Sequence, residues 1–491
     1  MSIETDTKLP QGWSLNLLKE VIQKLTDGSH NPPKKQTHGL PMLSARNIEN
    51  GYINFHEYRY IDPSDFELED KRTQIKPGDV LLTIVGAIGR ATVVPKNIQP
   101  FTLQRSVAVL SSLAFTPKFL MYQFRSPKIQ KELLGKAKGT AQKGIYLKKL
   151  SGIEMLIPPL NEQKRIVTKI EALQTRSTAV KEELEAIKPL LDQFRQSVLA
   201  SAFRGDLTKD WREQNPDVEP AEVLFSNSDD LVISSKPIPK TWIHIKLNSL
   251  INKIQAGKNF KCPEIPVNQD TVGLVKISAV TWGRFNPQET KTVDDESKIN
   301  PDLFINKGDF LVSRANTIEL VGASVIVEEI NYQIMISDKV WRVITNEKAN
   351  KQYIDFFLKS KQGRKEIETR ATGNQQSMRN IAQKAFSAIE IPYAPLEEQK
   401  EIVRRIESLF KLADSIEQQY QQAEVDLETL NQSILAKAFR GELVPQDPND
   451  EPASALLERI KADREKAKPK KSKTKKRNSK KQNKQLDIPG I

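Results

Sequence analysis

The sequence is poor in cysteine, in histidine and in long apolar stretches, and each shortage excludes a class of protein. Cys262 is the only cysteine, so an internal disulfide framework and a multi-cysteine metal site are both excluded. The four histidines are too few to predict a zinc site. No run of 18 apolar residues occurs, and residues 1–6 lack the apolar core of a signal peptide. We therefore expect a cytoplasmic protein that has no membrane span and no metal centre.

Motifs of catalysis are also missing. No Gly-x-x-x-x-Gly-Lys-Ser/Thr loop is present, which argues against ATP binding by a P-loop. Asn31-Pro-Pro33 resembles part of a base-modifying motif, but Lys34 stands where that motif needs an aromatic residue to stack on a base. Acidic residues around Glu69 and Glu296 lie in strongly polar segments, which are typical of solvated loops rather than metal sites. We expect no catalytic residue and no cofactor on this chain.

Charge alternates along the chain. Basic residues outnumber acidic ones by nine over residues 10–157 and by five over 238–393. Acidic residues are in excess by two over 158–225 and by eight over 394–458. Two basic segments thus alternate with two acidic ones, as expected if only the basic segments meet a polyanion.

The C-terminal residues carry most of the net charge of +13. Eleven Lys or Arg residues and no acid lie between Lys466 and Lys484. We expect a basic, disordered tail, which either only keeps the chain soluble or also contacts phosphates without reading sequence.

A long internal repeat is the most informative feature. Pro159-Leu-Asn-Glu-Gln-Lys-Arg-Ile-Val167 returns as Pro395-Leu-Glu-Glu-Gln-Lys-Glu-Ile-Val403, and Ala202-Phe-Arg-Gly-Asp-Leu207 returns as Ala438-Phe-Arg-Gly-Glu-Leu443. Both pairs are offset by the same 236 positions. The stretch between the two motifs has kept its length in both copies, which predicts that this length sets a distance.

Apolar residues between the two motifs recur at spacings of four and three, which predicts coiled-coil helices of roughly 40 residues and about 60 Å. Gly205 and Gly441 stand where each helix should end. Pro189 should kink the first helix or remove one of its hydrogen bonds. The predicted seam consists of Ile166, Ile170, Leu173, Val180, Leu184, Ile187 and Leu191 in the first copy, and of Ile402, Ile406, Leu409, Ile416, Leu427 and Leu430 in the second.

The segments before the helices have short β-branched runs between Gly, Pro and Asn turns, which predicts mixed α/β domains. They repeat only loosely: Ile75-Lys-Pro-Gly-Asp79 is answered by Ile305-Asn-Lys-Gly-Asp309. A shared framework with divergent content is expected of two copies of one scaffold that read different targets.

The predicted fold class is α+β: two mixed α/β target-recognition domains separated by two long antiparallel coiled-coil helices, with a pseudo-two-fold internal repeat. A parallel homodimer through one seam is the structural alternative, but it leaves the second seam without a partner. The expected segments are a first domain over 1–157, a spacer helix over 158–207, a polar linker over 208–237, a second domain over 238–393, a second spacer helix over 394–445 and the basic tail over 446–491.

From Leu9 to about Leu443 the chain resembles the specificity subunits of type I restriction–modification systems. The motif Pro-Leu-x-Glu-Gln-x-x-Ile-Val before each helix and the motif Ala-Phe-Arg-Gly-(Asp/Glu)-Leu after it carry the resemblance. Leu25–Pro33, Lys76-Pro-Gly-Asp79 and Lys307-Gly-Asp309 also look like parts of the target-recognition domains of that family.

The resemblance implies that each domain reads one half of a split, non-palindromic site in double-stranded DNA. It also implies that the helices set the spacing of the two halves and dock two methyltransferase subunits, which two restriction subunits join. S-adenosylmethionine, ATP and Mg are then expected on those partner subunits and no cofactor on this chain.

Base reading requires side chains that can bond base edges, chiefly Arg or Lys for guanine and Asn or Gln for adenine. For every candidate, a phosphate contact or plain surface charge is the alternative. A self-contained DNA-modifying or restriction enzyme, and a coiled-coil scaffold unrelated to DNA, also remain open. The candidates are Lys34, Lys35, Arg46, Arg105, Gln142 and Lys143 in the first domain, and Lys258, Arg284, Arg314, Asn374, Gln375, Gln376 and Arg379 in the second.

Overall fold

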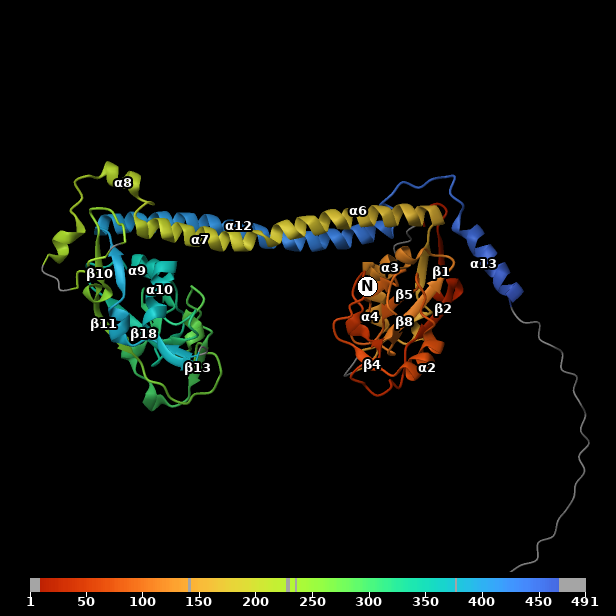
Figure 1. The fold of residues 1–491 in the computed structure, drawn as a ribbon, viewed down its shortest axis with the longest axis horizontal. Helices are drawn as coiled ribbons and strands as arrows, with labels where there is room; N and C mark the ends of the chain where they lie inside the picture. The colour runs from red at the N-terminus through yellow and green to blue at the C-terminus, as the bar shows by residue number, and fades with distance from the viewer. Residues whose placement is uncertain (1–8, 140–142, 227–229, 235, 376–377, 468–491) are drawn as a thin grey trace, which may run out of the picture. The chain divides into compact units, whose positions relative to one another are not determined.

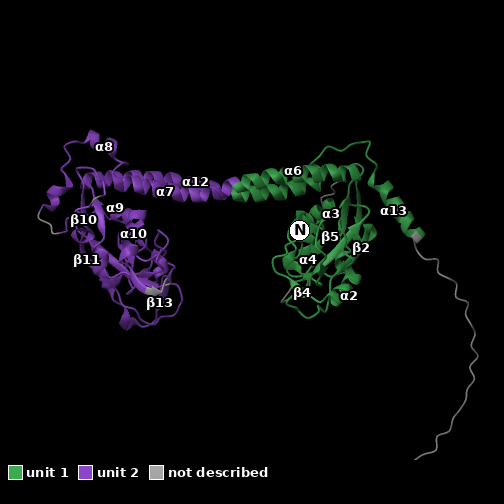
Figure 2. Ribbon diagram, viewed as in Figure 1, with its two compact units in different colours: residues 1–182, 424–491 green, residues 183–423 purple. Residues whose placement is uncertain are grey.

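The computed structural model describes residues 9–139, 143–226, 230–234, 236–375 and 378–467 (Figure 1). The chain is α+β and divides into two compact units (Figure 2). Unit 1 comprises residues 1–182 and 424–491, and unit 2 comprises residues 183–423. Each unit combines a domain of short strands and helices with parts of the long helices. None of the helices in the described part of the chain is long and apolar enough to cross a membrane.

The domain of unit 1 is built on a four-stranded sheet of order β2-β8-β5-β6. Side chains of β5 alternate between two cores: Val80 and Leu82 join the core beneath helix α3, and Leu81 joins the core on the other face. The bounds are β2 Ile22–Asp27, β8 Val107–Ser112, β5 Val80–Thr83 and β6 Ala91–Val93, with a second sheet of β4 Arg59–Ile61, β3 Leu40–Leu43 and β7 Thr102–Leu103, the pair β1 Ser14–Leu17 and β9 Glu154–Ile157, and the helices α2 Pro63–Thr73, α3 Pro117–Arg125, α4 Pro127–Lys136 and α5 Leu147–Leu150.

The domain of unit 2 has the same strand order in its four-stranded sheet, β11-β18-β14-β16. Both sheets have a register shift at the same place, between Ile22 and Lys24 in one and between Ile251 and Lys253 in the other. The bounds are β11 Ile251–Ala256, β18 Val340–Thr345, β14 Phe310–Ser313 and β16 Ser324–Ile326, with β13 Thr290–Val293, β12 Val272–Val275 and β17 Gln333–Met335, the pair β10 Ile243–Lys246 and β21 Glu390–Tyr393, and the helices α9 Lys351–Lys359, α10 Lys361–Arg370 and α11 Gln383–Ser387.

The long helices are α6 Leu160–Glu185, α7 Ile187–Arg204 and α12 Leu396–Ala438. The interruption between α6 and α7 matches the prediction for Pro189, which has no N–H to donate to the carbonyl of Glu185. Helix α7 ends at Gly205, whose φ of 82° is left-handed, as predicted.

Within unit 2, α7 and the first part of α12 run antiparallel. Arg195 bonds Asp414 at 2.9 Å and Glu417 at 2.8 Å, while Arg212, beyond the end of α7, reaches back to Glu398 near the start of α12. Within unit 1, Ile434, Leu435 and Ala438 at the end of α12 join the same core as residues near the start of α6.

The predicted seam is only partly buried. Ile166, Ile170, Ile402 and Ile406 are fully buried, because they also pack on the domain of their own unit. Leu191 is 7% exposed. Val180, Ile416 and Leu430 are 45%, 38% and 52% exposed, although Val180 and Leu430 line one apolar groove together with Leu173 and Leu427. No domain core covers them, and one partner helix covers only a narrow stripe.

Two segments predicted to be unstructured pack into cores. In the predicted linker, α8 Lys209–Gln214 and the 3₁₀ helix Ala221–Phe225 form, and Phe225 stacks edge-on against Tyr393 with ring centroids 5.0 Å apart. In the predicted tail, α13 Ala453–Ala467 buries Leu456, Leu457 and Ile460 in the core of unit 1. The tail prediction was therefore wrong for residues 453–467. Most of the lysine run, from residue 468 on, lies outside the described residues.

Candidate nucleic-acid interface

Several loops of unit 1 meet at one edge of its four-stranded sheet, and we call this edge loop edge 1. It comprises residues 28–39, 44–47, 84–90, 104–106 and 143–146. Backbone hydrogen bonds tie these loops together: Arg105 N–H donates to the Ser29 carbonyl at 2.8 Å, Gln104 N–H to Leu43 at 2.8 Å and Ile84 N–H to Ser106 at 2.9 Å. Segments far apart in the sequence thus present their side chains from one surface.

The described candidates of the first domain all lie on loop edge 1. Lys34, Lys35, Arg46, Arg105 and Lys143 are exposed. Within the described part of the chain, their one ion pair joins Arg46 to Glu57 across 3.8 Å, and both side chains are largely solvated. Gln142 lies outside the described residues. The fold therefore brings together five long basic side chains that the sequence separates by up to 109 positions.

Unit 2 has a corresponding edge, loop edge 2, which comprises residues 257–262, 276–284, 314–316, 337–339 and the described part of 372–380. Arg314 N–H donates to the Lys339 carbonyl at 2.8 Å and Gly257 N–H to Ser337 at 3.1 Å. Strand β15 Ala315–Asn316 pairs with β20 Met378–Asn380, which adds a small sheet with β19 Thr372–Gln375. Lys258 and Arg314 are exposed on this edge.

The five other candidates of the second domain differ from this pattern. Arg379 is half-buried and donates to the Gly373 carbonyl at 2.6 Å, so it supports the β19–β20 hairpin. Arg284 is 81% exposed and reaches Asp414 on α12 at 3.4 Å. Asn374 and Gln375 lie in β19, and the structure does not describe their side chains, while Gln376 lies outside the described residues.

The Lys-Pro-Gly-Asp and Lys-Gly-Asp motifs are turns that hold the sheets and do not lie on the loop edges. Asp79 accepts hydrogen bonds from the Lys76 N–H at 2.8 Å and from Lys24 at 2.7 Å. Asp309 accepts from the Asn306 N–H at 2.8 Å and pairs with Arg342 at 2.8 Å. The two motifs therefore recur in both domains because each forms a turn that holds its sheet.

The repeated Pro-Leu-x-Glu-Gln motif docks each long helix onto the domain before it. The indole N–H of Trp13 donates to Glu162 at 3.0 Å, and the indole N–H of Trp242 donates to Glu398 at 2.8 Å. Gln163 caps the neighbouring backbone by accepting from the Thr116 N–H at 2.8 Å and donating to the Ala114 carbonyl at 2.9 Å. The sequence analysis missed this role, although the two Trp residues stand in matching contexts, Pro10-Gln-Gly-Trp13 and Pro239-Lys-Thr-Trp242.

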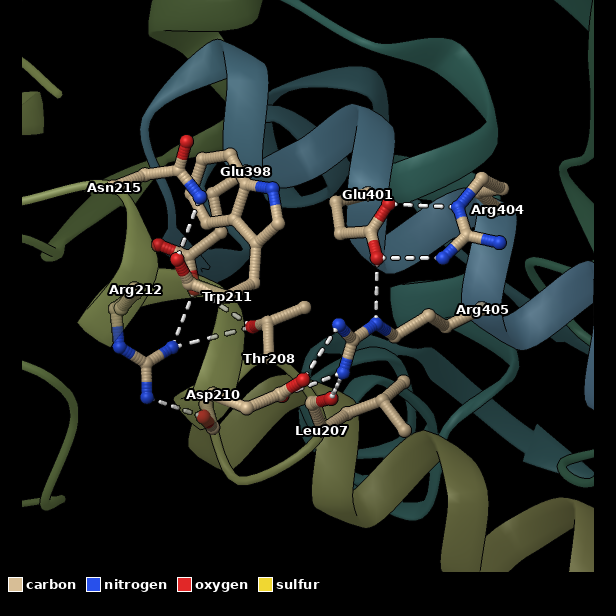
Figure 3. A network of polar contacts seen from close by, with 11 residues as sticks. Leu207, Thr208, Asp210, Trp211, Arg212, Asn215, Glu398, Glu401, Arg404 and Arg405 are labelled. Atoms are coloured by element: carbon tan, nitrogen blue, oxygen red, sulfur yellow. Dashed lines mark hydrogen bonds and ion pairs between the residues drawn. The ribbon is translucent and has the colours of Figure 1, made fainter.

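In unit 2 the carboxylate that docks the long helix, that of Glu398, lies in a larger polar network (Figure 3). We call it and the carboxylate of Glu162 the docking carboxylates. Glu398, 1% exposed, also accepts from the Thr208 hydroxyl at 2.7 Å and pairs with Arg212. Beside it, Arg405 bridges Glu401 and Asp210, each at 2.6 Å. Hydrogen bonds first from Arg404 and then from Arg405 lower the pKa of Glu401 to about 2. The segment 208–212 therefore clamps the start of α12.

Unit 1 lacks this clamp. At the offset of 236 positions, Thr208 and Arg212 correspond to Val444 and Pro448, which cannot bond a carboxylate. Glu162 is 1% exposed, and its Oε1 has no hydrogen-bond partner among the described residues. Burial is the largest cause that raises the pKa of Glu162. The two docking carboxylates therefore differ in their electrostatic surroundings.

Nothing in the described ranges suggests a reaction centre. They contain no group of three or more His, Cys, Asp and Glu residues that could hold a metal ion. Glu69, one of the acidic residues considered above, accepts a hydrogen bond from the Ser29 hydroxyl at 2.7 Å. The arrangement offers exposed cations on two sheet edges, which suits binding to an anionic polymer.

Comparison with known proteins identifies the class. The sequence pattern of the type I restriction modification DNA specificity domain matches residues 10–188 and 239–425, so the chain belongs to this family. The EcoKI specificity subunit of Escherichia coli strain K12 is 28% identical over 478 residues, which cover 93% of this chain and 96% of that one. The EcoBI specificity subunit of Escherichia coli is 33% identical over 333 residues, which cover 63% and 64%.

Two solved structures share the fold. One comes from work on complex assembly and conformational transition of the type I R-M system, with a TM-score of 0.62, 19% identity and coverage of 89% of this chain and 99% of that one. The other is the HsdS subunit from Thermoanaerobacter tengcongensis, with a TM-score of 0.53, 19% identity and coverage of 90% and 100%.

Proposed function

We propose that this chain is the DNA sequence-specificity subunit of a type I restriction–modification complex. One observation supports this most directly. Two sheets of the same strand order each carry an edge where loops converge, and the exposed basic side chains on the two edges differ. The same scaffold with different contact residues suits two readers of different sequences.

In this proposal each domain reads one half of a split, non-palindromic site in double-stranded DNA. The antiparallel long helices separate the two domains and fix the spacing between the two halves. Two methyltransferase subunits and two restriction subunits supply catalysis together with S-adenosylmethionine, ATP and Mg, and this chain itself performs no reaction. The family membership supports this division of roles.

The proposal is tested by mapping methylated bases in the DNA of cells that produce the chain with its methyltransferase subunit. We expect a split motif with two different halves and a fixed gap. A continuous or palindromic motif would contradict the proposal. Methyl transfer by the purified chain alone would instead favour a self-contained modification enzyme.

Arg105 is the most central basic residue of loop edge 1, since its backbone N–H bonds Ser29 and the adjacent Gln104 bonds Leu43. We expect Arg105→Ala to weaken binding of a matched duplex roughly tenfold and to affect a scrambled duplex much less, because base contacts discriminate and phosphate contacts do not. Fluorescence anisotropy of the assembled complex measures both affinities. Lys76→Ala is the control, since Lys76 lies before β5, at the opposite edge of the sheet. Equal weakening on both duplexes would mark Arg105 as a phosphate contact.

A further inference from the structure

Unit 1 has a cavity of about 780 Å³ between its domain and its long helices. Helix α3, the loop 50–52, helix α6 and the last turns of α12 line it. The cavity lies apart from the basic side chains of loop edge 1, none of which lines it. Its volume is within the range of pockets that bind ligands or peptide segments.

Arg125 projects into this cavity from the end of α3 without an anionic partner. Its guanidinium lies over the ring of Tyr122, 5.3 Å from the centroid, and it makes no hydrogen bond or ion pair with the described residues. Burial lowers the pKa of Arg125. Of the two nearby carboxylates, Glu171 pairs with Lys118, and Glu428 acts on Arg125 through its charge but makes no hydrogen bond to it. Its five N–H donors stay accessible in the cavity, where water or an oxyanion can accept hydrogen bonds from them.

The corresponding place in unit 2 is closed by ion pairs. Arg284 contacts Asp414, and Asp414 also pairs with Arg195. The counterpart of Arg125 is Lys359, which pairs with Asp355 at 2.6 Å and donates to the Gly283 carbonyl. Unit 2 thus satisfies its cations internally.

Unit 1 has neutral side chains at all three positions of that ion-pair chain. Tyr52 replaces Arg284, Thr178 replaces Asp414 and Asn431 replaces Arg195, and all three line the cavity. The cavity therefore leaves Arg125 without the ion pair that its counterpart Lys359 makes in unit 2.

An acidic protein segment has the chemistry that Arg125 can bind, because a planar carboxylate can bond a guanidinium through two parallel hydrogen bonds. Lys118 and Arg125 are balanced by Glu171 and Glu428 among the charged residues that line the cavity, so it is formally neutral. A neutral cavity with two carboxylates disfavours a nucleic-acid backbone, whereas a single carboxylate on a peptide is accommodated.

We infer that this cavity binds an Asp- or Glu-bearing segment of a methyltransferase subunit, and that only unit 1 offers such a site. The inference rests on the proposed function, since that function supplies the partner. It adds an asymmetry: of two methyltransferase copies on one chain, one gains a contact that the other lacks.

The test places a photoreactive benzoylphenylalanine at Tyr52 of the full chain, which is then assembled with its methyltransferase subunit, irradiated and analysed by mass spectrometry. We expect an adduct on a methyltransferase peptide that has an Asp or Glu within a few residues of the link. Adding Arg125→Gln should lower the adduct yield by at least about tenfold, since the charge pair is lost. Arg125→Lys should retain part of the yield, and Lys128→Gln on the exposed start of α4 should leave it unchanged.

Three results would overturn the inference: an adduct on duplex DNA, no adduct in a complex that has assembled, or equal yields with Arg125→Gln and Lys128→Gln. A second photoreactive residue at Arg105 separates this failure from failure of the proposed function. If the Arg105 position links to DNA and the Tyr52 position links to nothing, only the cavity assignment is wrong. If neither position links and the complex does not methylate DNA, the proposed function itself is wrong.

Discussion

Glu398→Gln is expected to destabilise unit 2 by about 3 kcal/mol, because it leaves the half-buried Arg212 beside a neutral amide. Glu398 is 1% exposed and accepts hydrogen bonds from Trp242, Thr208 and Arg212. Its loss should release the segment 208–212 from the start of α12. For a unit of this size, the midpoint of thermal unfolding should fall by roughly 6–12 °C. Hydrogen exchange would place the loss in unit 2, with α8 and the first turns of α12 exchanging fastest.

Glu162→Gln is the matched change in unit 1, and we expect it to be neutral or slightly stabilising at neutral pH. The amide oxygen still accepts from Trp13, and no cation is left unpaired at this position. Because burial raises the pKa of Glu162 in the folded state, its ionisation opposes folding once the pH rises through that pKa. The free energy of unfolding of the natural chain, relative to that of the Glu162→Gln variant, should therefore decrease as the pH is raised from acidic to neutral. Two results would contradict this difference between the two docking carboxylates: a stability difference that does not change with pH, or equal losses of stability in Glu162→Gln and Glu398→Gln.

The repeat illustrates what the sequence could and could not predict. The spacing of four and three predicted the long helices, and Pro189 and Gly205 predicted where the first of them breaks and ends. The role of Glu162 and Glu398 was hidden, because a glutamate in the first turn of a helix usually faces solvent and favours the helix dipole. Its burial depends on Trp13 and Trp242, which lie about 150 residues earlier in the sequence and meet it only in the folded chain.

The errors have a common physical cause. Heptad spacing identifies the apolar face of a helix but not what covers it, so it placed Leu430 in the seam without showing that its side chain is 52% exposed. Conversely, Phe225 and Leu457 lie in short segments whose polar composition favours a linker or a tail, yet each anchors its segment in a core. In the first domain, choosing basic residues in loops led to residues that lie on loop edge 1. In the second domain, Arg379 was chosen as a base reader because it is an arginine, but its side chain donates to the Gly373 carbonyl.

A triple variant of loop edge 1, with Lys34, Arg46 and Arg105 replaced by Gln, is expected to lower affinity for the matched duplex by about 100-fold. If these residues contact phosphates, the slope of log affinity against log salt should become shallower by roughly 2 to 3, since each phosphate contact contributes about 0.9. The matched control replaces Lys19, Lys76 and Lys96 by Gln, and this change removes the same charge from the opposite edge of the same sheet. Equal effects of the two variants would show that net charge, and not loop edge 1, determines binding.

The same variant should also change the methylated motif in cells, and in one half only. Its three substitutions lie in the first domain, so the half-site read by that domain should accept more sequences, while the other half and the gap stay unchanged. This follows because loop edge 2 and the long helices are untouched, and contacts that share no partner act nearly independently. Sequencing of methylated DNA from cells with the natural chain, the triple variant and the control would show it. Relaxation of both halves would mean that the two domains do not read the site separately, and loss of methylation without relaxation would mean that the three residues hold phosphates only.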